Sequence, residues 1–248
     1  MIKTEAPFKM SVTGIDGSGK DTVTRKALER VSSESGLSVV KLGRPAYRIE
    51  DGVATQIFQR TTEGIDRIHA YCDEVGKPGL ITAANALNVV VQTRILERQV
   101  DTTDYDIIAS SRDPRVDPTV YFDFYGGNTA SKVDLERRGR FMQSLTGVAR
   151  NLIVLLEVDP ETAVERIEAR IAAENAGQES MRPKWRHIHE NVKDLSSLAD
   201  GYHRALDELS CLEGTDIVRV DTNDKPADEV TNEVTQAIFE SYTKHKKL

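Results

Sequence analysis

The clearest signal in the chain is one short segment, Gly14-Ile15-Asp16-Gly17-Ser18-Gly19-Lys20-Asp21-Thr22. A β-branched stretch at residues 9–13 precedes it and predicts a strand, and an apolar pattern at residues 23–31 follows it and predicts a helix. Glycines let the backbone turn so that several amide N–H groups point inward, and the N-terminus of the helix adds positive potential. The segment therefore predicts a phosphate-binding loop (P-loop), in which Lys20 reaches the β- and γ-phosphates of a nucleotide.

Asp21 stands where this motif normally has the Ser or Thr that binds Mg²⁺, and Thr22 follows it. A carboxylate can bind Mg²⁺ directly or through a water, but an acidic side chain in the first helical turn is also stabilised by the helix dipole. Asp21 and Thr22 are thus the candidate metal ligands, with helix capping by Asp21 as the alternative. The residues expected to bind ATP are Gly14, Asp16, Gly17, Ser18, Gly19, Lys20, Asp21 and Thr22.

Short β-branched runs alternate with long helical patterns along the chain. The strand candidates are residues 9–13, 38–42, 107–110, 152–158 and 217–220. Gly36 is a credible stop for the helix that follows the loop. This rhythm is typical of βαβ units. It predicts one α/β domain over residues 1–248, a three-layer sandwich of the P-loop NTPase type with a mostly parallel sheet of about five strands and helices on both faces.

Composition limits the classes of partner. The chain has 248 residues, 39% of them hydrophobic, which excludes disorder. It carries 33 Lys and Arg against 40 Asp and Glu, a net charge of −7, whereas nucleic-acid-binding domains are usually strongly basic. The longest clear apolar run, residues 152–156, is too short to span a bilayer, and two cysteines make no disulfide framework. We expect a cytoplasmic protein that binds neither membranes nor nucleic-acid polymers.

A polar stretch at residues 172–185 separates two helical patterns. Its length and its arginines suit a lid around residues 170–187, and a solvated surface loop is the alternative. The arginines in or beside it are Arg166, Arg170, Arg182 and Arg186.

Four stretches together resemble the thymidylate kinase family of P-loop nucleoside monophosphate kinases. They are the loop at 14–22, the helical stretch at 85–94, the strand that leads into Ser111-Arg112, and the strand and helix at 155–167. By this likeness, Asp16 faces the sugar 3′-hydroxyl of the acceptor nucleotide, and Arg94 and Arg112 lie at the acceptor, with Arg112 clamping its phosphate. Tyr202 resembles a tyrosine late in the helix that leaves the lid. The resemblance also implies a homodimer formed through helices near the acceptor site.

The chain departs from the family at three places. Ser111 replaces an Asp, Gly43-Arg44-Pro45 stands where Arg-Glu-Pro is usual, and Tyr121-Phe122 stands where Tyr-Gln is usual. That Gln would pair with the edge of thymine, so its replacement weakens the case for thymine as the base. By the family resemblance, the expected acceptor is dTMP or a related deoxynucleoside monophosphate. The residues expected to act in transfer are Lys20, Arg112, Arg182 and Arg186. Those expected to bind the acceptor are Asp16, Arg44, Arg94, Arg112 and Tyr121.

The chemistry of the acceptor distinguishes two related reactions, phosphorylation of a nucleoside and phosphorylation of a nucleoside monophosphate. Phosphorylating a nucleoside means activating a neutral 5′-hydroxyl, usually with a carboxylate near the end of the second strand, and residues 43–48 hold no acid before Glu50. A monophosphate, with a second pKa of about 6, arrives largely ionised and needs positioning and charge neutralisation, which arginines supply. The sequence predicts ATP- and Mg²⁺-dependent transfer to a nucleoside monophosphate, giving the diphosphate. A deoxynucleoside kinase and a nucleotide-binding regulator with a degenerate kinase site are the alternatives.

Overall fold

A computed structural model describes residues 6–100, 104–127, 129–147, 149–174, 190–209 and 212–246. The strands are β1 (Phe8–Thr13), β2 (Val39–Leu42), β3 (Ala46–Glu50), β4 (Val53–Ile57), β5 (Ile107–Ser110), β6 (Leu152–Glu157) and β7 (Asp216–Asp221). The helices are α1 (Lys20–Ser35), α2 (Gln59–Val75), α3 (Pro78–Val90), the π-helical η1 (Val91–Leu96), α4 (Glu97–Gln99), α5 (Val116–Tyr125), α6 (Lys132–Thr146), α7 (Pro160–Glu174), α8 (Val192–Glu208) and α9 (Ala227–Lys246).

Within this part of the chain, seven strands form one sheet in the order β4-β3-β2-β5-β1-β6-β7. The five strands expected from the sequence pair in parallel, as predicted. The expectation of about five strands is too low, because β3 and β4 add an antiparallel hairpin at the β2 edge. The turn of this hairpin is Asp51-Gly52, with φ of 51° and 77°. Two positive φ angles in a two-residue turn match the twist of a hairpin, and Asp-Gly is a preferred pair there.

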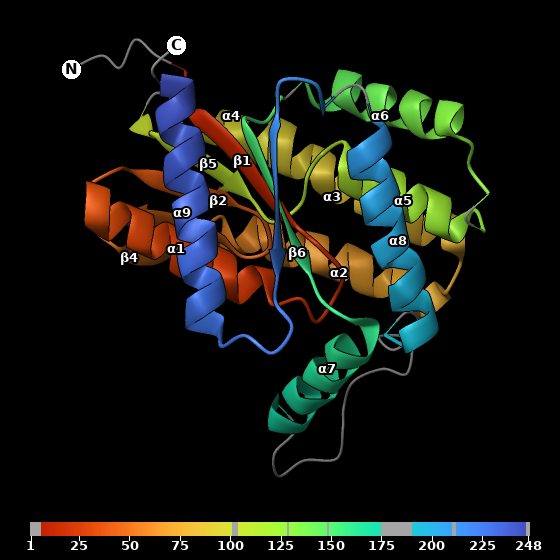
Figure 1. Cartoon of the computed structure of the whole chain (residues 1–248). Helices are drawn as coiled ribbons and strands as arrows, with labels where there is room; N and C mark the ends of the chain where they lie inside the picture. Colours follow the sequence, from red (N-terminus) through yellow and green to blue (C-terminus); the bar gives the residue numbers. More distant parts are fainter. Residues whose placement is uncertain are drawn as a thin grey trace.

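Helices cover both faces of the sheet (Figure 1). On one face, α1 and α9 lie side by side and pack apolar residues such as Leu28 and Val234 on the strands. On the other face, α5 and α8 pack against β6, while α2 and η1 pack against β2 and β5. Alternate residues of β6 serve the two cores, Val154 on the first face and Ile153 on the second, as strand geometry requires. The three-layer sandwich predicted from the sequence is therefore the observed fold.

The sheet brings several loops to one edge. Ligands of open α/β sheets bind outside the carboxyl ends of the parallel strands. At this edge β1 leads into Gly14, β2 into Gly43, β5 into Ser111 and β6 into Val158. Segments distant in the sequence therefore converge at the mouth of the phosphate-binding loop.

One helical stretch, Gly79–Gln99, is long and apolar enough to cross a membrane by length and composition alone. Its most apolar window is 56% buried inside the molecule. The stretch spans most of α3, η1 and α4, and α3 packs against α2 and α5. A buried helix in a sandwich core passes the same test, so this stretch is weak evidence for a membrane span.

Candidate active site: a phosphate-binding loop among buried cations

The loop between β1 and α1 has the backbone that phosphate binding requires. Gly14, Gly17 and Gly19 have φ of 146°, 83° and 81°, a region that residues with a Cβ rarely adopt. Two of these glycines also lie against neighbouring backbone. A Cβ on Gly14 would lie 2.6 Å from the Leu156 carbonyl oxygen, and one on Gly17 would lie 2.5 Å from that of Ala163. The loop is thus held between the end of β6 and the first turns of α7.

Lys20 lies in the loop as the motif predicts. It is 9% exposed, and its Nζ donates to the Ile15 carbonyl at 3.2 Å and to Asp16 Oδ1 at 3.1 Å. Burial by itself lowers the pKa of Lys20, but Asp16, Tyr121 and Asp21 together outweigh burial, and the pKa is raised. The lysine therefore stays charged at neutral pH, and a nucleotide phosphate would meet a fixed cation.

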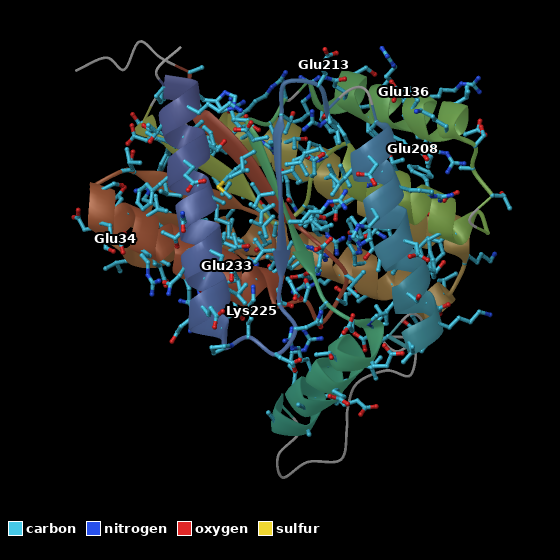
Figure 2. The ribbon with its side chains drawn as sticks, viewed as in Figure 1. Glu34, Glu136, Glu208, Glu213, Lys225 and Glu233 are labelled. Carbon is cyan, nitrogen blue, oxygen red and sulfur yellow. The ribbon has the colours of Figure 1, made fainter. Side chains whose placement is uncertain are left out.

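Two hollows adjoin the loop. One, of about 210 Å³, lies between the loop residues 16–22 and Arg166, Ile167 and Arg170 of α7. The second, of about 250 Å³, is lined by Ser18, Val23, Arg166, Thr222 and Lys225 among others. Lys225 precedes α9 and pairs with Glu233 at 2.7 Å, and both are labelled at the lower part of α9 (Figure 2). The first hollow thus has three basic side chains in its lining, Lys20, Arg166 and Arg170.

A larger hollow of about 450 Å³ lies between the end of β6 and α8. Its lining includes the carboxylates of Glu157, Asp159, Asp200 and Asp221. Like charges in close quarters repel, so this lining disfavours phosphate despite its greater volume. The phosphate-binding loop and its cations mark the site instead.

Arg112 is held at the loop by a buried network. Its Nη1 lies 3.3 Å from Asp117 Oδ1, and its guanidinium lies over the Tyr121 ring, 5.4 Å from the centroid. Asp117 also accepts hydrogen bonds from Thr13 Oγ1 at 2.8 Å, Tyr202 OH at 2.8 Å and the Asp113 amide at 2.7 Å. The structure thus brings Arg112, Tyr121 and Tyr202 together, all three singled out from the sequence.

A second arginine and a buried histidine lie beside Arg112. Arg44 follows β2 and pairs with Asp66 of α2 at 2.8 Å. One turn further along α2, His69 is 9% exposed, and its Nε2 has no hydrogen-bond partner among the described residues. Burial, together with the positive charges of Arg44 and Arg112, lowers the pKa of His69 to about 3. The imidazole is therefore neutral, and sequence analysis missed it because a lone histidine in a helix carries no motif.

Lys41 of β2 is the other group that sequence analysis missed. It is completely buried, yet its Nζ lies 3.6 Å from Asp21 Oδ1 of the phosphate-binding loop. Burial lowers the pKa of Lys41, and Asp21 opposes that shift. A lysine within a strand looks like an ordinary edge or surface residue, so only the fold shows that this one faces the loop.

The residues at the loop fit a magnesium ion carried by a nucleotide. The Asp21 side chain is 60% exposed and, with Thr22, borders the hollow of about 210 Å³. A carboxylate oxygen open to that hollow is the hard donor that Mg²⁺ prefers. Across the described ranges, no group of three or more His, Cys, Asp or Glu side chains could enclose a metal. The fit is therefore to an ion shared with nucleotide phosphates, as Mg²⁺ is commonly bound.

Of the arginines predicted for the site, one lies elsewhere and two are outside the described residues. Arg94 lies elsewhere, because its Nε donates to the Leu145 carbonyl at 2.7 Å and its Nη2 to the Ser144 carbonyl at 3.4 Å. It thus binds the free carbonyls at the end of α6, as basic side chains near helix C-termini do, and this corrects its placement at the acceptor. Arg182 and Arg186, with most of the predicted lid, lie outside the described residues.

The buried imidazole predicts a pH dependence of stability. An unfolded His69 has a pKa of 6.5 and the folded one about 3, so the unfolded state binds the extra proton between these values. The free energy of unfolding should fall by about 2 kcal/mol from pH 7 to pH 5 through this residue alone. Urea unfolding at both pH values should show that loss in the wild type and not in His69→Gln.

His203→Gln is the matched control, since that side chain is 41% exposed on α8. It should leave the pH-dependent loss in place. Equal losses in the wild type and in His69→Gln would contradict the low pKa.

No protein-family model and no curated protein sequence matches the chain. Solved structures do match. Deoxyadenosine kinase from M. mycoides with dCMP and dCDP bound superposes with a TM-score of 0.58 at 14% identity, covering 94% of this chain and 100% of that one. The same kinase with dCTP gives 0.56 at 14% identity and 94% and 100% coverage, and with dATP 0.56 at 14% identity and 93% and 98% coverage. The chain therefore has the three-layer α/β fold of the P-loop deoxynucleoside kinases.

Proposed function

We propose that this protein transfers the γ-phosphoryl group of ATP to a deoxynucleoside monophosphate. ATP phosphates would lie on the loop around Lys20, with the base in the hollow beside Arg166 and Thr222. The acceptor would lie across the loop, against Arg112 and Arg44. An oxygen of the acceptor phosphate then bonds to the γ-phosphorus as the bond to the β,γ-bridging oxygen breaks. ADP leaves with that electron pair.

The observation that carries the proposal is the identity and pairing of the charged groups at the acceptor. Arg44, a cation, occupies the end of β2 where activation of a hydroxyl calls for a carboxylate. The carboxylates near it are already paired, Asp66 with Arg44 and Asp117 with Arg112. Two arginines with fork-shaped donors suit a dianionic phosphate that needs no general base.

A second candidate is phosphorylation of a deoxynucleoside. It is favoured by the fold, since the matched solved structures are of a deoxyadenosine kinase over nearly the whole chain. In that reaction a carboxylate would have to take the 5′-hydroxyl proton. Asp16, whose side chain is 33% exposed beside Lys20, is the candidate base.

One assay separates the candidates. ADP release with ATP and Mg²⁺ is measured against dTMP, dCMP, dAMP and dGMP and against the corresponding deoxynucleosides. We expect monophosphates to give the higher kcat/KM. Faster turnover of deoxynucleosides would establish the second candidate. ATP binding without transfer to either class would establish a nucleotide-binding regulator.

Asp21 is expected to tune the metal requirement. Mg²⁺ supplies charge neutralisation at the β- and γ-phosphates when it is bound with ATP. Asp21→Ser replaces a charged oxygen donor by a hydroxyl, so transfer should persist while the Mg²⁺ concentration for half-maximal activity rises several-fold. A Mg²⁺ titration of both proteins measures this, and identical titrations would leave Asp21 as a helix-capping residue.

Exposed apolar side chains support the homodimer that the family resemblance implies. Ile68 and Tyr71 of α2 are 44% and 65% exposed, and Leu80 and Leu87 of α3 are 41% and 44% exposed. These two helices also carry His69 and Ala84, whose backbone hydrogen-bonds to the His69 side chain, near Arg44 and Arg112. We infer pairing through this face, which would bury apolar surface.

A further inference from the structure

Lys41 is a buried cation that the reaction described above does not use. Its side chain is 1% exposed, and its Nζ donates to the Pro45 carbonyl at 3.2 Å and lies over the Tyr47 ring, 5.6 Å from the centroid. Its charged partner is Asp21, 3.6 Å away. Lys41 therefore links the turn after β2 with the first turn of α1.

Structural pairing alone accounts poorly for this lysine. Burying an ammonium costs free energy that is recovered only by a well-placed, equally buried counter-charge. Asp21 is 60% exposed, so water screens much of its attraction for Lys41. An apolar side chain would fill a buried strand position between Val40 and Leu42 without that cost. The cation is best explained by a second anionic partner.

The position of the pair identifies that partner. Asp21 directly follows Lys20, the residue that reaches the β- and γ-phosphates, and both border the hollow of about 210 Å³. On the other side of Lys41 lies the turn that carries Arg44, the proposed acceptor arginine. The ammonium thus lies between the loop that carries Lys20 and the turn that carries Arg44.

We propose that Lys41 is a catalytic residue that binds the transferred γ-phosphoryl group, opposite Lys20. This inference rests on the proposed use of a nucleoside triphosphate. The exposed Asp21 carboxylate covers the ammonium and turns toward the hollow when a triphosphate enters, and a γ-phosphate oxygen takes its place on Nζ. Charge-assisted contacts of this kind are among the stronger ones in a site with little water.

The test compares a ligand that has a γ-phosphate with one that lacks it. Isothermal titration of the full chain with AMP-PNP and with ADP, both with Mg²⁺, gives the two dissociation constants. In Lys41→Met we expect AMP-PNP to bind at least about tenfold more weakly and ADP to bind as in the wild type. Lys26→Met is the matched control, because Lys26 is an ion-paired lysine on α1 whose side chain is 37% exposed, and it should change neither constant.

Thermal unfolding of the same proteins excludes a purely structural role. Lys41→Met should unfold at the same temperature as the wild type or higher, because a buried charge is removed and Asp21 stays hydrated. Lys41→Gln, which keeps a donor for the Pro45 carbonyl, repeats the comparison should the methionine variant fail to fold. Unchanged affinity for both nucleotides, or equal weakening of both, would overturn the proposal.

These binding measurements need no acceptor. A wild type that transfers no phosphoryl group but still loses AMP-PNP affinity in Lys41→Met would refute the proposed function and leave the role of Lys41 standing. If the wild type transfers normally and Lys41→Met is equally active, the role of Lys41 would be refuted and the proposed function would stand.

Discussion

Replacing Lys20 with alanine should lower phosphoryl transfer at least a hundredfold, about 2.7 kcal/mol in the activation free energy. The lysine of this motif reaches the β- and γ-phosphates of a nucleotide, and nearby Asp16, Tyr121 and Asp21 raise its pKa against burial, so it is charged at neutral pH. Its two hydrogen bonds both lie within the loop, to Ile15 and Asp16. Circular dichroism and thermal unfolding should therefore match the wild type.

Steady-state ADP release measures the effect, with Lys26→Ala as the control on the same helix. Unchanged turnover in Lys20→Ala would remove the phosphate-binding loop from the reaction. A loss of the folded state would instead assign Lys20 a structural role.

Arg112→Lys is expected to lower kcat/KM for the acceptor by one to two orders of magnitude, about 1.4–2.7 kcal/mol. The substitution keeps a positive charge but removes the planar fork of donors that meets two phosphate oxygens at once. It also weakens the geometry around Asp117 and Tyr121, which now fix the guanidinium. ATP affinity should stay close to that of the wild type.

Kinetics at varied acceptor and fixed saturating ATP give the first quantity, and nucleotide titration gives the second. Arg98→Lys, an exposed position on α4, is the control. Weaker ATP binding with intact acceptor kinetics would place Arg112 at the donor and not at the acceptor.

The parallel strands and the loop were predictable because their signals are local. A β-branched run, a glycine-rich turn and an amphipathic helix each lie within a few residues, and Gly36 ends α1 with φ of 70° as its position suggested. The β3–β4 hairpin also had a local signal, Asp51-Gly52 between two strand-forming runs. The hairpin was not predicted because the alternation of strands and helices in the rest of the chain led us to expect only βαβ units.

Residues of the candidate site were predictable only where they belong to a sequence motif. Lys20 and Arg112 stand in recognisable patterns, and both lie at the loop. Lys41 and His69 depend on burial and on charges brought in from distant segments, which no window of sequence reports. For Arg94 the helix was predicted correctly but the contact of the side chain was not. Its guanidinium binds the end of α6, some 50 residues away in the sequence.

The shared carboxylate of Asp117 makes the network around Arg112 tolerant of some substitutions and sensitive to another. Its two oxygens receive donors from β1, from the segment before α5 and from α8. A lineage could lose the hydroxyl of Thr13 or Tyr202 and keep the remaining bonds. Replacing the carboxylate would leave all of these buried donors without their acceptor. Substitutions that are neutral in evolution are therefore expected at Thr13 and Tyr202 and not at Asp117.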